Sequence, residues 1–309
     1  MSSNAHVPVL LGPVLKGLNV KQDGIYIDGT FGRGGHSSAI LAALNKEGRL
    51  IAIDRDPQAI ASAASVLTND PRLTLIRSDF AKLATRINEQ GLTGRVNGLL
   101  LDLGVSSPQL DEADRGFSFL RDGPLDMRMD PDSGISAAEF LGNVEKKSLT
   151  RLLRMYGDEP MAARIAGAVV ASRETSAIET TGQLADIVAS VVPAHTRKKH
   201  PATKTFQAIR IFINNELEQL EAALTQSIDL LAKGGRLCVI SFHSLEDRIV
   251  KRFIRDASRE TEQYRGMPNV PKEFQPKLKP IGKGIVATAD EIAANVRARS
   301  ARLRIAERT

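Results

Sequence analysis

Four short apolar runs, each closed by an aspartate, constrain the fold of this chain more than any other feature. The aspartates are Asp28, Asp54, Asp79 and Asp102, and helical patterns with short loops separate the runs. Such alternation of strands and helices predicts an α/β fold with a doubly wound, mostly parallel sheet. Ligands of such sheets bind beyond the C-terminal ends of the strands. We therefore expect the four acids to share one ligand-binding edge.

The turn between the first run and its helix is rich in glycine. Gly32, Gly34 and Gly35 lie in it, and His36 opens a helical pattern. Glycine permits backbone angles and a close ligand approach that a side chain would block. A turn of this kind before a helix N-terminus is typical of a nucleotide-like ligand. The dinucleotide fingerprint fails, because its third glycine would fall on Ser37. The alternative is a turn that needs glycine for its geometry alone.

The positions of the acids favour S-adenosylmethionine as the ligand. Asp54 lies about twenty residues beyond the glycine turn, where a carboxylate accepts hydrogen bonds from ribose hydroxyls. Asp79 can accept from an adenine amino group, and Phe80 offers a flat apolar face to the purine. The amides around Gly34, Gly35 and His36 suit the methionyl carboxylate, and Asp28 can counter the methionyl ammonium. Each acid alone could equally be a solvated turn residue.

Asp102 opens the segment that is expected to carry the chemistry. Enzymes that methylate an exocyclic amine place an acid or amide, then Pro-Pro and an aromatic residue, at this position. The amine is a poor nucleophile because its lone pair is delocalised into the ring, and acceptors for its hydrogens favour pyramidalisation. Ser107 and Pro108 resemble part of that motif, whereas Gln109-Leu110 replaces the Pro-aromatic pair. Asp102, Ser107 and Pro108 are therefore the candidate catalytic residues.

The fifth strand of the pattern comes late in the chain. The apolar run Leu237–Ser241 follows the fourth run by more than a hundred residues, and amphipathic helical patterns fill the interval. A helical insert explains this spacing. We place the insert at 109–204, between the two parts of a methyltransferase domain, 1–108 and 205–309.

Two further patterns make local predictions. Residues 203–233 contain neither Gly nor Pro, which predicts one long helix. Arg302–Ile305 alternates apolar and basic residues, which predicts an outer strand with one solvent-exposed face.

Composition limits the class of protein. The formal charge of +6 and the isoelectric point near 9.5 are compatible with a polyanionic partner. The single cysteine, Cys238, allows no intramolecular disulfide and is expected in the core. The histidines lack ligand spacing, so no metal site is expected. No run is long enough to span a membrane and no signal peptide is evident, so we expect a cytoplasmic protein. The oligomeric state stays open, and a homodimer is one of the states allowed.

Eight segments together closely resemble the RsmH (MraW) family of bacterial 16S ribosomal RNA cytosine-N4 methyltransferases. They are Asp28–His36, Asp54–Pro57, Leu101–Gln109, Arg115–Phe119, Gly123–Asp130, His200–Thr203, Phe206–Arg210 and Ser241–Arg248. The resemblance implies methylation of cytosine N4 at position 1402, in the decoding centre of the small ribosomal subunit. It also implies an inserted helical domain that helps to form the RNA-binding surface. By motif, it implies cofactor contacts from Gly34, Gly35, His36, Asp54, Phe80, Asp102 and Gln109.

Candidate contacts to the RNA substrate come from aromatic, basic and histidine side chains. They are Phe117, Phe119, Arg128, Arg197, Lys198, Lys199, His243, Arg297 and Arg299, with Arg302 and Arg304 as further phosphate contacts. Each type has a structural alternative. The aromatic residues can cover the sheet edge, Arg128 can belong to a salt-bridged loop, and His243 can cap a helix. The remaining cations can form a solvated basic face.

Other function classes remain open at this point. An NAD-dependent oxidoreductase is opposed by the missing third glycine and by the Asp79-Phe80 pair. A non-catalytic ribosome-assembly module could retain the cofactor, and a DNA amino-methyltransferase would use similar chemistry. The residues themselves leave open whether the substrate is naked ribosomal RNA or the assembled subunit.

Overall fold

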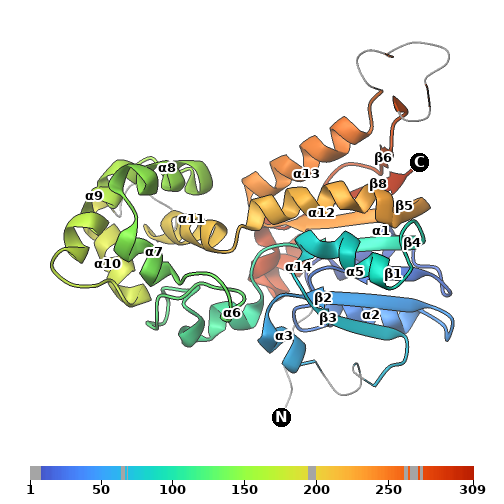
Figure 1. The fold of residues 1–309 in the computed structure, drawn as a ribbon, viewed down its shortest axis with the longest axis horizontal. Helices are drawn as coiled ribbons and strands as arrows, with labels where there is room; N and C mark the ends of the chain where they lie inside the picture. The colour runs from blue at the N-terminus through green and yellow to red at the C-terminus, as the bar shows by residue number, and fades with distance from the viewer. Residues whose placement is uncertain are drawn as a thin grey trace. The chain divides into compact units, whose positions relative to one another are not determined.

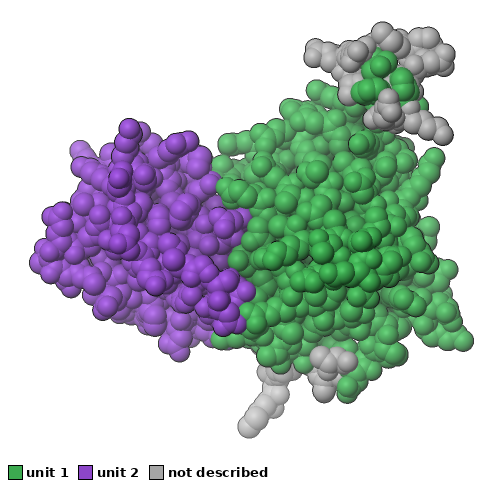
Figure 2. All heavy atoms as spheres, in the orientation of Figure 1, with its two compact units in different colours: residues 1–104, 217–309 green, residues 105–216 purple. Residues whose placement is uncertain are grey.

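The computed structural model of the chain describes residues 8–63, 67, 69–193, 200–260, 264, 271 and 274–309. It divides into two compact units, coloured separately in Figure 2. The first unit comprises residues 1–104 and 217–309, and the second comprises residues 105–216. The predicted insert, 109–204, therefore ends twelve residues before the second unit does. The difference arises because the helix that follows residue 204 packs against a helix of the second unit.

The first unit is built on one eight-stranded sheet (Figure 1). Its strands are β1 (Ile25–Asp28), β2 (Arg49–Asp54), β3 (Leu73–Arg77), β4 (Val96–Asp102), β5 (Leu231–Ser241), β6 (Leu278–Pro280), β7 (Ile285–Val286) and β8 (Arg302–Arg308). The order is β3-β2-β1-β4-β5-β8-β6, with β7 also paired to β8. Strands β1 to β5 run parallel, and β8 runs antiparallel to β5. The predicted doubly wound, mostly parallel sheet is confirmed.

Helices cover both faces of this sheet, as the alternation of strand side chains requires. Ile27, Leu99 and Val239 point to the face covered by α5, α12 and α13, whereas Tyr26 and Cys238 point to the other. The helices of the first unit are α1 (Leu11–Leu18), α2 (Gly35–Ala43), α3 (Pro57–Ala61), α5 (Leu83–Glu89), α12 (Glu216–Leu230), α13 (Ser244–Ala257) and α14 (Ala289–Ala294). Short 3₁₀ helices span Phe80–Lys82 and Val296–Ser300. Cys238 is fully buried, which confirms its predicted place in the core.

The second unit is helical. Its helices are α6 (Ser107–Asp111), α7 (Ala137–Asn143), α8 (Lys146–Gly157), α9 (Ala162–Arg173), α10 (Thr181–Val191) and α11 (Thr203–Ile213), with a 3₁₀ turn at Ala113–Arg115. The amphipathic stripe of α8 buries Leu149, Leu152 and Leu153 against α9 and α11. This apolar core is separate from the two that flank the sheet, so the second unit has the packing of a domain.

Two local predictions are wrong. The expected long helix is two helices, because the chain turns at Asn214 and Asn215, and Asn215 adopts a left-handed backbone with φ 49°. Asn tolerates this conformation better than other non-glycine residues. The predicted outer strand is β8, whose Leu303 and Ile305 are buried as expected. It is internal, however, because β6 and β7 pair with its other side.

No helix in the described part of the chain is both long and apolar enough to cross a membrane.

Candidate active site

The parallel strands bring the four predicted acids to one edge of the sheet. Asp28, Asp54 and Asp102 are the last residues of β1, β2 and β4, and Asp79 follows β3 by two residues. Asp28 is in register with Ala52 on β2 and with Leu100 on β4, so these strands end at similar levels. The shared edge follows from local sequence, since each apolar run ends where its polar residue begins.

Asp54 ties the end of β2 to the glycine turn. Its Oδ2 accepts from the amide of Gly32 at 2.7 Å, and its Oδ1 accepts from the amide of Asp56 at 2.9 Å. Burial raises the pKa of Asp54 to about 6, although these two amide hydrogen bonds oppose the shift. A carboxylate oxygen can accept more than one hydrogen bond. Asp54 can therefore hold the turn and still accept from a pair of ribose hydroxyls.

The three glycines of the turn meet different requirements. Gly32 adopts φ 54°, and an added Cβ would meet only the carbonyl of Thr30, at 3.9 Å. At Gly34 an added Cβ would lie 2.8 Å from the ring of Phe31, and at Gly35 it would overlap Pro8. The amide of Gly34 already donates to the carbonyl of Phe31 at 2.8 Å. Internal packing thus explains Gly34 and Gly35, and only Gly32 leaves room for a ligand to approach.

Asp79 and Phe80 lie at the end of β3 as predicted, but Asp79 has protein partners. Its Oδ1 lies 3.2 Å from Nε of Arg55, and its Oδ2 lies 3.7 Å from Nζ of Lys82. Phe80 begins a 3₁₀ turn and is partly buried against the core, which leaves part of its ring accessible. The pair can still border an adenine, with Asp79 also neutralising two cations.

Asp102 lies beside the buried imidazole of His36. Its Oδ2 is 3.5 Å from Nε2 of His36, and its backbone amide donates to Oγ1 of Thr30 at 2.7 Å. Asp28 is fully buried, accepts from Oγ of Ser37 at 2.7 Å, and has its pKa raised by that burial. Sequence reasoning missed Thr30 and Ser37. The signal that could have identified them is a hydroxyl side chain on each side of the glycine turn.

In the second unit, Ser107 and Pro108 open α6, with Pro108 in the first turn of the helix, where proline is tolerated. The side-chain oxygen of Gln109 accepts from the amide of Ser106 at 2.9 Å and completes a capping box. Gln109 is buried. The cofactor contact predicted for Gln109 stays a prediction.

The predicted aromatic contacts are packed within the second unit. Phe117 is only 6% exposed, and the guanidinium of Arg115 lies 5.8 Å from its ring centre. Phe119 stacks on His200 at 4.4 Å and meets Phe206 edge-on at 5.0 Å. Phe119 therefore packs at the border of the helical core, and Phe117 is buried beside Arg115. Their contacts to RNA stay predictions.

The loop Gly123–Asp130 is anchored at several points. Arg128 binds Asp126 through two hydrogen bonds of 2.8 and 2.7 Å. The side chain of Asn214 donates to the carbonyl of Met127 and accepts from the amide of Met129. Met127 holds φ 63° and is fully buried. This geometry agrees with the salt-bridged loop that was the alternative for Arg128.

His243 is the N-cap of α13. Its Nδ1 accepts from the amide of Glu246, and Oε2 of Glu246 accepts from the amides of Phe242 and His243. This is a reciprocal capping box, so the structure supports the capping alternative for His243.

The predicted basic contacts differ in availability. Arg299 is exposed in the last 3₁₀ turn, whereas Arg297 is half-buried. Arg304 is committed to Asp247 through contacts of 2.6 and 3.0 Å, with Arg302 at 3.8 Å from the same carboxylate. Arg197, Lys198 and Lys199 lie outside the described residues.

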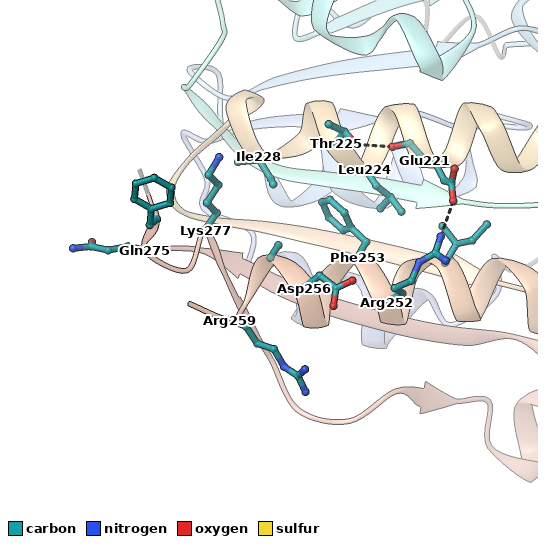
Figure 3. Close-up of a pocket in the computed structure, with 13 residues that line it drawn as sticks. Glu221, Leu224, Thr225, Ile228, Arg252, Phe253, Asp256, Arg259, Gln275 and Lys277 are labelled. Carbon is teal, nitrogen blue, oxygen red and sulfur yellow. Dashed lines mark hydrogen bonds and ion pairs between the residues drawn. The ribbon is translucent and has the colours of Figure 1, made fainter. Parts of the chain in front are cut away.

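A separate pocket of about 530 Å³ lies between α12 and α13 in the first unit (Figure 3). Leu224, Ile228 and Phe253 form its apolar part, and an ion pair of 2.9 Å between Arg252 and Glu221 crosses one side. It contains none of the residues predicted for cofactor or substrate. It is therefore not part of the candidate site.

Comparison with known proteins decides the family. A family model described as the MraW methylase family matches residues 3–309. The ribosomal RNA small subunit methyltransferase H of Nitrosococcus oceani is 54% identical over 306 residues, covering 99% of this chain and 97% of that protein. The chain belongs to the MraW methylase family. As a member of that family it is a methyltransferase, and S-adenosylmethionine is its cofactor.

Solved structures also resemble this MraW-family methylase, but only distantly. A putative rRNA methylase from Clostridium thermocellum is 15% identical with a TM-score of 0.45, covering 98% of this chain and all of that chain. A putative methyltransferase from Streptococcus mutans, solved with S-adenosylhomocysteine, is 12% identical with a TM-score of 0.41 and has the same coverage. Likeness at this level adds nothing to the assignment.

The first unit of this MraW-family methylase has a donor and acceptor set that fits S-adenosylmethionine. Asp54 retains acceptor capacity, Phe80 is partly exposed, and a Cβ added at Gly32 would meet only the carbonyl of Thr30. Among the described residues, Oδ1 of Asp102 is buried and has no hydrogen-bond partner. Such an orphan acceptor is expected where a ligand group completes the bonding.

Proposed function

We propose that this methyltransferase modifies the N4 amine of cytosine 1402 in the decoding centre of 16S ribosomal RNA. One structural observation carries the proposal: Oδ1 of Asp102 is a buried acceptor without a partner among the described residues, at the ligand-binding edge of the sheet. The small-subunit ribosomal RNA assignment is supported by the name of the 54% identical relative. The cytosine and its position are supported by the motif resemblance.

The chemistry explains why an unpartnered acceptor is needed. When bound, S-adenosylmethionine supplies an electrophilic methyl group on a sulfonium centre. The cytosine amine is a weak nucleophile, and Asp102 can accept one of its hydrogens so that the nitrogen pyramidalises. As the carbon–nitrogen bond forms, the sulfur–methyl bond breaks and S-adenosylhomocysteine would leave as a neutral thioether. Positive charge develops on the nitrogen, and the Asp102 carboxylate would stabilise that charge. The proton can then leave to water because the methylated ammonium is acidic, so no separate general base is needed.

The other residues at this edge of the sheet would hold the cofactor. Asp54 would accept from the ribose hydroxyls and Phe80 would cover the adenine, with Asp79 at its amino group. Gly32 would permit the close approach that its open surroundings allow. The buried carboxylate of Asp28, whose two oxygens already accept hydrogen bonds from Ser37 and Thr30, would act on the methionyl ammonium through charge alone.

The second unit and the basic residues would bind RNA. A chain with a net charge of +6 is suited to a polyanion, and Arg299 is exposed and so accessible to phosphate. We assign the helical unit, residues 105–216, to substrate recognition. The site of action would be the cytoplasm, where the ribosomal subunit is assembled.

The test is methyl transfer to 30S subunits and to naked 16S RNA, both isolated from cells that lack the modification. Mass spectrometry of the decoding-site fragment should show one methyl group on N4 of cytosine 1402. A methyl group on another nucleotide or on a ribose hydroxyl would reject the proposed target. Binding of S-adenosylhomocysteine without transfer to either substrate would instead favour a non-catalytic assembly role.

A further inference from the structure

The imidazole of His36 is buried beside Asp102, and cofactor binding by the His36 backbone does not explain this position. It is the second residue of α2, and it is only 6% exposed. Its Nε2 lies 3.5 Å from Oδ2 of Asp102, which is longer than a normal hydrogen bond but within ion-pair distance. Within the described part of the chain, neither ring nitrogen has a partner that meets hydrogen-bond geometry.

The charges around the ring favour its protonated form. Burial alone would lower the pKa of His36, but the carboxylates of Asp102 and Asp28 and the carbonyl of Val9 together raise it above the usual value. These groups come from the ends of β4 and β1 and from the segment before α1. Asp28 acts on the ring through its charge, and its two oxygens accept from Oγ of Ser37 and from the amide of Thr30.

The two oxygens of Asp102 are therefore distinct. Oδ2 faces the imidazole, whereas Oδ1 is buried and has no partner among the described residues. The backbone of Asp102 is fixed separately by Oγ1 of Thr30. A protonated imidazole 3.5 Å from Oδ2 favours the rotamer of Asp102 that keeps this oxygen beside the ring.

We propose that the His36 side chain is a positioning residue that pairs with Oδ2 of Asp102 and sets the direction in which this carboxylate meets the reacting amine. This inference rests on the proposed function only for the identity of the amine. His36 contributes an imidazole within ion-pair distance of Asp102, in addition to the cofactor contact that the family resemblance assigns to this residue. Removing the ring should therefore impair methyl transfer more than cofactor binding.

The first experiment measures the pairing without any substrate. NMR titration of the full chain gives the pKa of the His36 imidazole, with H36Q used to assign the resonance. We expect D102N to lower that pKa, because the partner charge is lost. D79N is the matched control, since Asp79 lies at the same sheet edge but pairs with Arg55 and Lys82, and it should leave the value unchanged. Equal titration in wild type and D102N would overturn the pairing.

The second experiment separates positioning from cofactor binding. Single-turnover methylation by H36L should slow by at least about tenfold, equivalent to roughly 1.4 kcal/mol in the barrier. Its affinity for S-adenosylhomocysteine, measured by calorimetry, should stay within about threefold of wild type. H36Q should recover part of the rate, because the glutamine amide can donate near the position of Nε2.

Two results would contradict the role assigned to His36: a full rate in H36L, or parallel losses of rate and S-adenosylhomocysteine affinity. If H36L does not fold, H36Q and the titration still decide. If wild type methylates neither RNA substrate, the proposed function fails while the titration continues to test the His36–Asp102 pair. The two failures are therefore distinguishable.

Discussion

The two units place their predicted site residues in opposite situations. In the first unit, parallel strands deliver Asp54 and Asp102 to one edge and leave them acceptor capacity. In the second unit, Phe117 is buried, Arg128 is paired with Asp126, and the oxygen of Gln109 caps a helix. A motif residue at the end of a parallel strand is positioned by topology, whereas one in a connecting loop is first used to hold that loop. The motif alone does not tell a residue that is available to a ligand from one that stabilises a loop.

The largest effect should come from Asp102. Replacement by alanine removes the only oxygen of the site that is both buried and unpartnered within the described residues. We expect the single-turnover methylation rate to fall by roughly 10²- to 10³-fold, as for removal of one transition-state hydrogen-bonding group. Asp23→Asn, at an exposed acid before β1, is the control and should retain the wild-type rate. A normal rate in D102A would show that the strand-end carboxylate of Asp102 is not used in methyl transfer.

Asn214→Ala should show that the second unit uses its polar residues for stability. Asn214 is buried and its amide bonds the carbonyls of Met127 and Arg210 and the amide of Met129. Losing these bonds leaves buried backbone groups unsatisfied and should lower the free energy of unfolding by about 2–3 kcal/mol. Urea unfolding followed by circular dichroism measures this. Asn143→Ala, at an exposed residue with one bond to the carbonyl of Glu139, is the matched control and should cost less than about 1 kcal/mol.

Asp54 should affect cofactor affinity in a pH-dependent way. Asp54→Ala is expected to weaken binding of S-adenosylhomocysteine by about tenfold to thirtyfold, the value of a hydrogen bond to a charged group. Since the pKa of Asp54 is about 6 in the folded protein, wild-type affinity should fall as the pH drops below 6 and the acceptor is protonated. Calorimetry at pH 5.5 and 7.5 tests both points. An equal pH dependence in the alanine variant would assign the titration to another group.

The same shift predicts the pH dependence of stability without ligand. Folding raises the pKa of Asp54 from 3.8 to about 6, so between these values the folded state binds more protons than the unfolded state. The contribution of Asp54 to stability must therefore decrease as the pH rises through this window. Asp54→Asn should remove that contribution. Between pH 4.5 and 7 the free energy of unfolding should therefore fall less, or rise more, in the variant than in wild type, as measured by urea unfolding at both pH values.

Arg299 should give the smallest effect. Its replacement by glutamine should weaken RNA binding modestly and reduce the slope of log affinity against log salt by about 0.7–0.9 for one lost phosphate contact. Arg255→Gln, at an exposed arginine of α13 that pairs with Asp256, is the matched control and should leave the slope unchanged. Equal slopes in wild type and R299Q would place the RNA surface elsewhere.

The sequence predicted the features that local patterns determine. The first four strands, the glycine turn and the acids at the strand ends follow from apolar runs and turn residues, and the structure places them as expected. The break at Asn214-Asn215 was not predicted, because it lies within an uninterrupted apolar stripe and depends on Asn214 bonding a distant loop. The internal position of β8 depends on β6 and β7, two short strands whose sequences show no clear apolar–polar alternation. The pairing of His36 with Asp102 depends on how α2 packs and leaves no local signal.

The position of β8 also has a consequence for how the chain reaches its native state. This strand pairs with β5 on one side and with β6 and β7 on the other, yet it follows all three in the sequence. During synthesis, β1 to β5 emerge first, and β5 then presents an unpaired edge until Arg302–Arg308 has left the ribosome. Exposed edges of this kind favour pairing with other chains. The completion of the sheet, and with it the protection of nascent chains from aggregation, therefore depends on a segment that is translated after every other described strand of the sheet.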